Sequence, residues 1–491
     1  MKLLLRGHSD RYNLEQLQMT LFPEATMEYV EAPFSPEEDG AISTLSVGEH
    51  FLTATAKITV NGKTARASRR LKKELETVPL RRRILQQSYY LAAIQLLDQP
   101  PPWGALAGVR PTKLATKHVL AGNTFASADR MLRDTYFVSP ERRNLCLEAS
   151  KSTIHAVSLL EPTDISMYVG IPFCPTRCAY CSFVSQSIER CGNLVDAYLE
   201  ALLEEIAHTG KLLRESPWRI RTLYIGGGTP TTLSAEQLDR LMGAIETHFD
   251  LSRLIEYTVE GGRPDTLTRE KLDVIRAHHC ERISINPQTM SDDVLKAIGR
   301  RHSVSDVLAS YEDARQAGFS AINMDLIAGL PGDTPESFAA SLEQVLALDP
   351  ANVTVHTLAL KRSAELYQQR INLPEQQAVA AMLENAEVRL RELGYAPYYL
   401  YRQKYMSGSF ENVGWCKPGQ DCLYNIYMME ELHTVLSVGG GGMNKVNLAG
   451  GKILRFHNPK HPKEYLDRLE TVLSEKVEIF KLLKEEAPYV D

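Results

Sequence analysis

The sequence predicts an α/β protein whose centre is an open barrel of six parallel strands. Six short apolar segments recur after residue 164, and a helical pattern follows each of them. Polar, glycine-rich stretches stand almost without exception where these segments end. Alternating strands and helices form parallel sheets with right-handed crossovers, and a complete barrel of this kind has eight units. Six units therefore predict a partial (β/α)6 barrel of the TIM type, flanked by an N-terminal α/β domain and a C-terminal α/β extension.

Composition and net charge indicate which broad classes of protein this sequence can belong to. Hydrophobic residues make up 44% of the 491 residues and charged residues 24%, which suits two or three folded domains. A net charge of −6 does not suit a general nucleic-acid binder, so no nucleic-acid partner is expected. The sequence has no apolar run of about 18 residues and no signal-peptide core, so we expect a cytoplasmic protein without a membrane span. Its eight cysteines would then be reduced, and clustered cysteines would indicate a metal or catalytic site.

The segment before the barrel predicts an N-terminal α/β domain at residues 1–98. A first strand, MKLLLRG, precedes a helical stretch, and FLTATAKITV alternates as a strand before Asn61-Gly62, a strong hairpin signal. Residues 70–98 follow a helical pattern that ends at three prolines. Residues 99–163 are then expected to form a helical connector. Its basic residues either pack one domain on the next or contact an acidic ligand; they are Arg110, Lys113 and Lys117.

The barrel is predicted at residues 164–395, and a C-terminal substrate-side domain at residues 396–491. The strands are, in chain order, ISMYVGI, RTLYI, LIEYTV, RISI, AINMDLI and NVTVHTLA. Two helix starts are clear, since Ser234 opens a capping box and Thr334-Pro335 fits an N-cap followed by proline. The stretches after the strands are PFCPTRCAYC, GGGTPT, EGGRPDT, NPQTM, AGLPGDT and LKR. Because the carboxyl ends of barrel strands meet at one rim, these stretches predict a single site.

Three cysteines stand directly after the first barrel strand, in the pattern C-x3-C-x2-C: Cys174, Cys178 and Cys181. A structural zinc site normally needs four protein ligands in closed tetrahedral coordination, and the nearest candidate for a fourth thiol is Cys191, ten residues after Cys181. Incidental buried thiols are a second alternative, which three cysteines within eight residues do not favour. An iron–sulfur cubane normally takes four cysteines, so three thiolates leave one iron open for a ligand.

This spacing resembles the signature of the radical S-adenosylmethionine (SAM) enzymes. The resemblance implies a [4Fe-4S] cluster held by the three cysteines, with the amino and carboxylate groups of SAM on the open iron. One electron from the cluster then cleaves SAM to a 5'-deoxyadenosyl radical, which abstracts hydrogen. The cofactors carry this chemistry, and the protein supplies positioning, electrostatics and exclusion of water.

A closer resemblance covers nearly the whole chain. YVGIPFCPTRCAYCSF, LYIGGGTPT, RISINPQTM and NMDLIAGLPGDT are similar to segments of the oxygen-independent coproporphyrinogen III dehydrogenase (oxidase) family. WGALAGVRPTKL and ENVGWCKPG resemble the variant of that family with a long N-terminal extension, found in Bacillus-like and Clostridium-like bacteria. The resemblance implies ten contacts to SAM: Tyr168 beside the cluster, Gly227, Gly228 and Thr229 at the methionyl end, Tyr180 and Ala359 near the adenine, and Glu260, Gln288, Arg300 and Asp325 at the ribose and methionyl groups.

The family activity that this implies is oxidative decarboxylation of two propionates of coproporphyrinogen III to vinyl groups. The product would be protoporphyrinogen IX, in anaerobic haem biosynthesis, and a reductant such as flavodoxin or ferredoxin would supply the electron. The substrate carries four carboxylates, so basic residues near the rim are candidates to bind it, with solvated surface charge as an equal alternative. These residues, none of which is assigned a catalytic role, are Lys361, Arg362, Arg402, Lys404 and Lys417.

Two departures from the better-known dehydrogenase stand in the cluster motif. Gly170 replaces a family histidine, and Phe183 replaces a cysteine that lies near a second SAM in the family. Haem chaperones of the same family also lack that cysteine, so a haem chaperone is one alternative, and a radical SAM methylase or haem-degrading enzyme is another. Cys416 and Cys422 are expected to be structural or free thiols. YAPYYLY, near the end of the barrel, predicts either the lining of a macrocycle pocket or a packed strand.

Overall fold

A computed structural model gives the structure of the protein. It describes residues 1–486 except for 24, 36, 107, 109, 182–185, 360–363, 365, 367–372 and 403–409. The chain divides into two compact units: Met1–Leu147 with Gly408–Phe410, and Glu148–Ser407 with Glu411–Asp491. None of the described helices combines the length and the apolar character that crossing a lipid bilayer requires.

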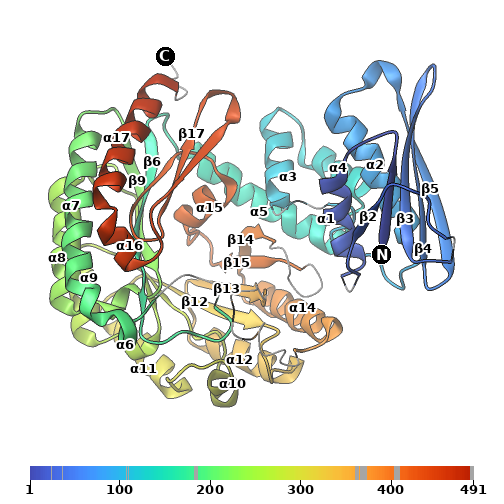
Figure 1. The fold of residues 1–491 in the computed structure, drawn as a ribbon. Helices are drawn as coiled ribbons and strands as arrows, with labels where there is room; N and C mark the ends of the chain where they lie inside the picture. Colours follow the sequence, from blue (N-terminus) through green and yellow to red (C-terminus); the bar gives the residue numbers. More distant parts are fainter. Residues whose placement is uncertain are drawn as a thin grey trace. The chain divides into compact units, whose positions relative to one another are not determined.

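The N-terminal unit is built on a five-stranded sheet in the order β2-β1-β3-β4-β5 (Figure 1). Strand β1 (Lys2–Arg6) runs parallel to β2 (Glu28–Val30) and to β3 (Gly40–Val47). Strands β4 (Phe51–Val60) and β5 (Lys63–Lys72) continue the sheet in antiparallel pairing. The parallel pairs follow from the helix between β1 and β2, and the antiparallel pairs from short turns.

The predicted hairpin is present, whereas the predicted helix after it begins later than expected. Asn61 and Gly62 form the two-residue turn between β4 and β5, with φ of 49° and 73°. The helix predicted over 70–98 is α2 (Val78–Ala93), and Thr77 caps its first turn. The expected start at residue 70 is therefore wrong. The end of the exposed edge strand β5 is rich in charged residues, and this pattern fits the polar face of a helix as well as it fits an edge strand.

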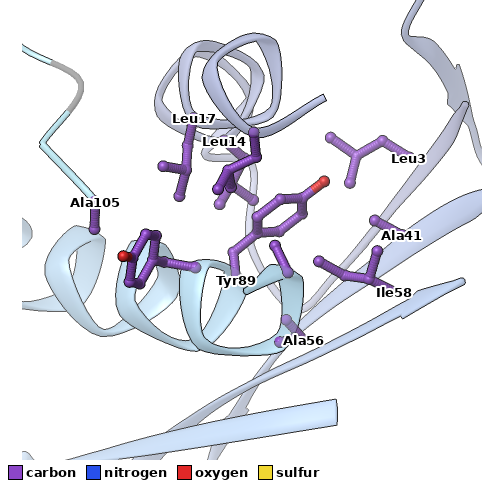
Figure 2. Packing of buried hydrophobic residues seen from close by; sticks show 12 residues of the cluster. Leu3, Leu14, Leu17, Ala41, Ala56, Ile58, Tyr89 and Ala105 are labelled. Atoms are coloured by element: carbon purple, nitrogen blue, oxygen red, sulfur yellow. The ribbon is translucent and has the colours of Figure 1, made fainter. Parts of the chain in front are cut away.

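The core of this unit lies between the sheet and the helices α1 (Arg11–Leu21) and α2 (Figure 2). Leu14 of α1, Tyr89 of α2 and Leu3 of β1 meet there and are completely shielded from solvent. Full burial of such side chains contributes about 1.5–3 kcal/mol each. The Tyr89 hydroxyl donates to Gln18 Oε1 at 2.6 Å, so its polar end is also satisfied.

Three helices follow the sheet: α3 (Pro111–Leu120), α4 (Phe125–Tyr136) and α5 (Pro140–Ser158). Thr124 caps α4 by accepting a hydrogen bond from a backbone N–H of its first turn. Phe137 ends the same helix in the left-handed conformation, with φ of 58°. Both ends of α4 are thus defined by residues outside its helical turns.

The second unit contains the partial barrel, and all six predicted strands are present. In chain order they are β6 (Asp164–Ile171), β9 (Arg219–Gly227), β10 (Glu256–Gly262), β11 (Arg282–Ile285), β12 (Ala321–Ala328) and β13 (Asn352–Thr357). Each is parallel to its neighbour in the sheet. The predicted fold class is therefore confirmed.

Helices connect these strands and cover the outside of the barrel, as α7, α8 and α9 do beside β6 and β9 (Figure 1). The helices of this region are α6 (Ile188–Cys191), α7 (Val195–Arg214), α8 (Ala235–His248), α9 (Arg269–Ala277), α10 (Asp292–Ala297), α11 (Val304–Gln316), α12 (Pro335–Ala347) and α14 (Gln376–Glu392). Both predicted helix starts are confirmed, since Ser234 and Thr334 each form a capping box.

The C-terminal residues extend the barrel sheet at both edges. Strands β14 (Ala396–Tyr401) and β15 (Asn412–Cys416) lie antiparallel beyond β13. At the other edge, β16 (Val435–Gly439) is parallel to β6, so the parallel part of the sheet gains a strand that was not predicted. The remaining elements are α15 (Leu423–Glu430), β17 (Met443–Asn447), β18 (Ile453–His457), α16 (Pro462–Asp467) and α17 (Leu469–Glu486).

Candidate functional site

The three cysteines lie on the loop that follows β6, at the carboxyl end of the barrel strands. Cys174 belongs to the short strand β7 (Phe173–Cys174), which pairs with β8 (Gln186–Ser187). Cys181 N donates to Cys178 O at 3.0 Å, so these two residues share a tight turn. Cys178 is buried, whereas Cys174 and Cys181 are partly exposed. The loop therefore presents thiols at the surface of the site while it is anchored within the fold.

The glycine-rich stretch after β9 packs directly against this loop. Thr229 N donates to Phe173 O at 2.7 Å, and Thr229 Oγ1 donates to Cys174 Sγ at 3.6 Å. A Cβ atom on Gly228 would lie 2.4 Å from Phe173 O and 2.9 Å from Cys174 Sγ, so a side chain there would displace the cysteine. Gly227 has a φ of 128°, which also favours glycine. GGGTPT is thus the support of the cysteine loop.

Two carboxylates, Glu260 and Asp325, come from strands β10 and β12, which β11 separates in the sheet. Glu260 of β10 accepts a hydrogen bond from Gly227 N at 3.4 Å. Burial, together with the charge of Asp325, raises the pKa of Glu260 to about 8. Burial also acts to raise the pKa of Asp325. The interactions with His356 at 3.5 Å and with Asn323, which donates at 2.8 Å, act in the other direction, and the net effect is a lowered pKa. The two groups are thus set to different protonation near neutral pH.

Gln288 and Arg300 carry buried polar atoms that have no partner among the described residues. They are Gln288 Oε1 and Arg300 Nε. Gln288 has a φ of 70°, and its N–H donates to Asp325 O at 2.8 Å, which places it beside β12. Arg300 Nη2 donates to Tyr180 Oη at 3.1 Å, and the Tyr180 ring packs against an apolar cluster that includes Ile298. Unpartnered buried polar atoms are destabilising unless a ligand or water satisfies them.

Three tyrosines stack in the interior of the barrel. Tyr224 lies 6.2 Å from Tyr168 and 4.7 Å from Tyr424, between ring centroids, with nearly parallel planes. Tyr424 comes from α15, whose first N–H groups are bound by the carboxylate of Glu256 at 2.7 and 2.8 Å. Tyr224 was not among the residues predicted from the sequence. A signal for it exists, since Tyr168 and Tyr224 each stand two residues before a glycine on adjacent strands in register.

The structure gives a physical reason for Gly170. A Cβ atom at this position would lie 2.6 Å from Gly440 O, so no side chain can be placed there without moving the turn after β16. Tyr198 locks that turn, since its hydroxyl donates to Gly170 O at 2.7 Å and accepts from Gly440 N at 2.6 Å. The backbone of the glycine turn thus occupies the space that the family histidine would enter.

The other predicted residues are spread more widely. Ala359 follows β13 and is partly exposed. Arg402 is buried, and burial lowers its pKa to about 10. Lys417 does not lie at the cysteine rim, because its N–H binds Ala351 O at the amino end of β13. Phe183, Lys361, Arg362 and Lys404 lie outside the described residues.

The remaining thiols stand apart from the cysteine loop. Cys416 and Cys422 are buried, and the Cys422 thiol donates to Glu256 Oε1 at 3.4 Å. Cys191 ends α6 and is partly exposed. In the part of the chain that the structure describes, no three metal-ligating side chains converge on a single ion. A cubane does not need such convergence, because each of its thiolates binds a different iron.

These features define a class: a partial barrel that carries three cysteines on the loop after its first strand is a radical SAM protein. The family model "Radical SAM superfamily" matches residues 168–345. The chain is 41% identical over 389 residues to the "oxygen-independent coproporphyrinogen-III oxidase-like protein HemZ" of Bacillus subtilis, and 78% of each chain is covered. It therefore belongs to the radical SAM family of oxygen-independent coproporphyrinogen III oxidase-like proteins.

Two further relatives mark the breadth of this family. The haem chaperone HemW of Bacillus subtilis is 34% identical and is matched over 58% of this chain and 73% of its own length. The solved structure of coproporphyrinogen III oxidase HemN from Escherichia coli matches with a TM-score of 0.52 and 25% identity. That match covers 66% of this chain and 73% of HemN. Relatives named as an oxidase and as a haem chaperone thus both match this chain.

The cofactors of the superfamily are a [4Fe-4S] cluster and SAM, and the residues present fit both. Three cysteine side chains on one loop, none of them in a disulfide, match the three cysteine ligands of such a cluster. The close approach at Gly228 and the unpartnered polar atoms of Gln288 and Arg300 fit a polar ligand beside that loop. The donor set therefore agrees with the cofactors.

Proposed function

We propose that this chain is a radical SAM enzyme that converts coproporphyrinogen III to protoporphyrinogen IX. The observation that supports this most strongly is its 41% identity, over 78% of its length, to a coproporphyrinogen-III oxidase-like relative. The barrel supports it too, since the cysteine loop after β6, the carboxylates of β10 and β12, and a stack of tyrosines from β6, β9 and α15 belong to the same unit.

Each group of residues has a distinct role in this proposal. Cys174, Cys178 and Cys181 would hold the cluster, which together with bound SAM would supply a 5'-deoxyadenosyl radical. Gly228 lets the methionyl end approach the loop closely, and Arg300 donates to its carboxylate through the Nε atom that has no described partner. The ionised carboxylate of Asp325 accepts from the ribose hydroxyls.

The proposed reaction removes a hydrogen atom, carbon dioxide and one electron from each of two propionates. The hydrogen atom leaves the carbon next to the ring, and bound SAM would supply the radical that accepts it. The bond to the carboxylate then breaks, a vinyl group forms, and an external acceptor takes the remaining electron. The aromatic rings of Tyr168, Tyr224 and Tyr424 offer an apolar surface for a macrocycle and exclude water from the radical. A flavodoxin or ferredoxin is proposed as the reductant.

A haem chaperone is the second candidate, and the 34% identity to HemW is the observation that favours it. A chaperone would bind haem without turnover, whereas an oxidase would release a decarboxylated product. The two functions therefore differ in what happens to the tetrapyrrole rather than in the cluster.

The test is anaerobic incubation of the iron-reconstituted protein with SAM, dithionite and coproporphyrinogen III, followed by mass spectrometry. The oxidase proposal expects 5'-deoxyadenosine and tetrapyrroles lighter by one and two units of formic acid. Both products should be absent with Cys178→Ala. Stoichiometric binding of haem, with no decarboxylated product under any of these conditions, would instead establish the chaperone.

A further inference from the structure

We propose that Arg263 positions the cysteine loop and raises the reduction potential of the cluster by holding a buried positive charge beside Cys178. The inference rests on the proposed assignment of the three cysteines to the cluster, and it is independent of which tetrapyrrole the protein processes. Arg263 follows β10 and is only 3% exposed. It stands in the stretch EGGRPDT, between the glycines that end β10 and Pro264.

The guanidinium of Arg263 reaches the loop between two of the cysteines. Its Nη1 donates to Thr176 Oγ1 at 2.7 Å and to Thr176 O at 3.3 Å. The same nitrogen lies 3.9 Å from Cys178 Sγ, within hydrogen-bonding distance for sulfur. Thr176 stands midway between Cys174 and Cys178, so one side chain fixes the segment that separates two cluster ligands.

A second pair of contacts fixes the orientation of this guanidinium. Nε and Nη2 donate to the two carboxylate oxygens of Asp265 at 2.9 and 2.7 Å, a bidentate pair. Asp265 is also approached by His302 Nδ1 at 3.6 Å. Because the guanidinium is planar, this pairing leaves Nη1 directed at the loop. Lysine would offer only a point charge and could not do both.

Charge balance points to a role beyond clamping. Burying a cation is costly unless it is paired. Asp265 balances the positive charge of Arg263 when no cluster is bound. A cluster held by three thiolates adds negative charge on the other side of the guanidinium, and that charge increases on reduction. Hydrogen bonds to the sulfurs and the surrounding charge are two of the factors that set the potential of iron–sulfur clusters. A cation at this position therefore favours the reduced state.

A purely structural role is the competing explanation, because Arg263 also ties the end of β10 to the loop. The two explanations differ in one measurable quantity. A clamp changes how well the cluster is retained, whereas a buried charge changes the potential of clusters that are retained. Asp265→Asn is the informative partner variant. It keeps Arg263 and its contact to Thr176, but it removes the negative charge that offsets the guanidinium.

The experiment is an anaerobic redox titration of the reconstituted protein without substrate, followed by the electron paramagnetic resonance signal of the reduced cluster. Arg263→Gln should lower the ratio of reduced to oxidised cluster at least tenfold at a fixed potential, which for one electron corresponds to 59 mV. Asp265→Asn should raise that ratio. The matched control is Arg221→Gln, which removes a partly buried arginine that pairs with Asp164. Arg221 lies near the start of β9, at the opposite end from the cysteine loop, so this change should not alter the ratio of reduced to oxidised cluster.

Potentials of Arg263→Gln and Asp265→Asn that equal the wild-type value at full iron content would overturn the proposal. If Arg263→Gln cannot retain iron, Asp265→Asn decides: a raised ratio supports the proposal, and an unchanged or lowered ratio refutes it. These outcomes are distinct from failure of the proposed function. A wild-type cluster that is tuned as expected but forms no decarboxylated product would refute the oxidase alone.

Discussion

Replacing Lys476 by methionine tests how the C-terminal helix supports the cysteine loop. Lys476 of α17 is 1% exposed and lies 3.2 Å from the fully buried carboxylate of Glu205 in α7. Its ammonium also donates to Ser437 O and, at 3.0 Å, to Asn444 Oδ1. Glu205 in turn binds Gly439 N at 2.7 Å, at the start of the glycine turn that packs on Gly170.

The magnitude follows from what remains after the change. Methionine keeps the apolar stem of lysine as far as Cε but has no ammonium, so it leaves Glu205 as a buried charge whose remaining partners are neutral, among them Tyr465 Oη at 2.5 Å and Asn458 Nδ2 at 2.9 Å. Removing one member of a buried ion pair costs about 3–5 kcal/mol. The double variant with Glu205→Gln removes both charges, so it should lose less than the sum of the single changes.

The assay is hydrogen exchange of peptides from β16 and from β1, read by mass spectrometry under native conditions. A loss of 3 kcal/mol corresponds to exchange about a hundredfold faster in β16, because 1.4 kcal/mol is about a factor of ten. Peptides of β1 serve as an internal control, since they belong to the other compact unit. A loss below about 1 kcal/mol in β16, or equal acceleration in β1, would refute this account of the buried pair.

Three further predictions concern the site itself. Gly170→Ala should destabilise the barrel by about 1–3 kcal/mol and reduce iron retention, because its Cβ would lie 2.6 Å from Gly440 O. Thermal unfolding measures the loss of stability. The control is Gly243→Ala, which should not destabilise the protein because its Cβ would meet its nearest neighbour at 3.9 Å. Cys178→Ala should abolish cluster absorbance and iron binding while Cys191→Ala leaves both intact, and equal iron in the two variants would contradict the cysteine assignment. Glu260 has a folded pKa of about 8 against an ordinary value of 4.5, so the folded state binds its proton more tightly and stability falls as pH rises from about 5 to about 8. Glu260→Gln should lack this component, so its stability relative to wild type should rise across that window in denaturant titrations, and a constant difference would count against the pKa assignment.

The strands, the helix starts and the cysteine loop could be predicted because their signals are local. Runs such as ISMYVGI are apolar over the length of one strand, and the capping residue at Ser234 lies within one turn of the helix it starts. The glycines of GGGTPT were predicted to let SAM approach the backbone, and that stays a prediction. The structure shows a different close contact, because a Cβ at Gly228 would meet Phe173 O and Cys174 Sγ.

The parts that were missed depend on contacts between residues far apart in the chain. VLSVG reads as a strand, but nothing local shows that it pairs with β6, more than 260 residues earlier. Lys476 lies on an amphipathic helix and resembles a solvated charge until α7 supplies Glu205. Arg263 was one residue in a strand-end stretch, and its role depends on Thr176, which the sequence separates from it by 87 residues.

One measurement tests the central claim of a radical enzyme that acts on a propionate side chain. Coproporphyrinogen III carrying deuterium on the propionate carbons next to the ring is incubated anaerobically with the reconstituted protein, SAM and dithionite. The account predicts that 5'-deoxyadenosine gains deuterium in proportion to the decarboxylated tetrapyrrole formed, and that Cys178→Ala forms neither product. Unlabelled 5'-deoxyadenosine in the absence of any vinyl product would contradict it.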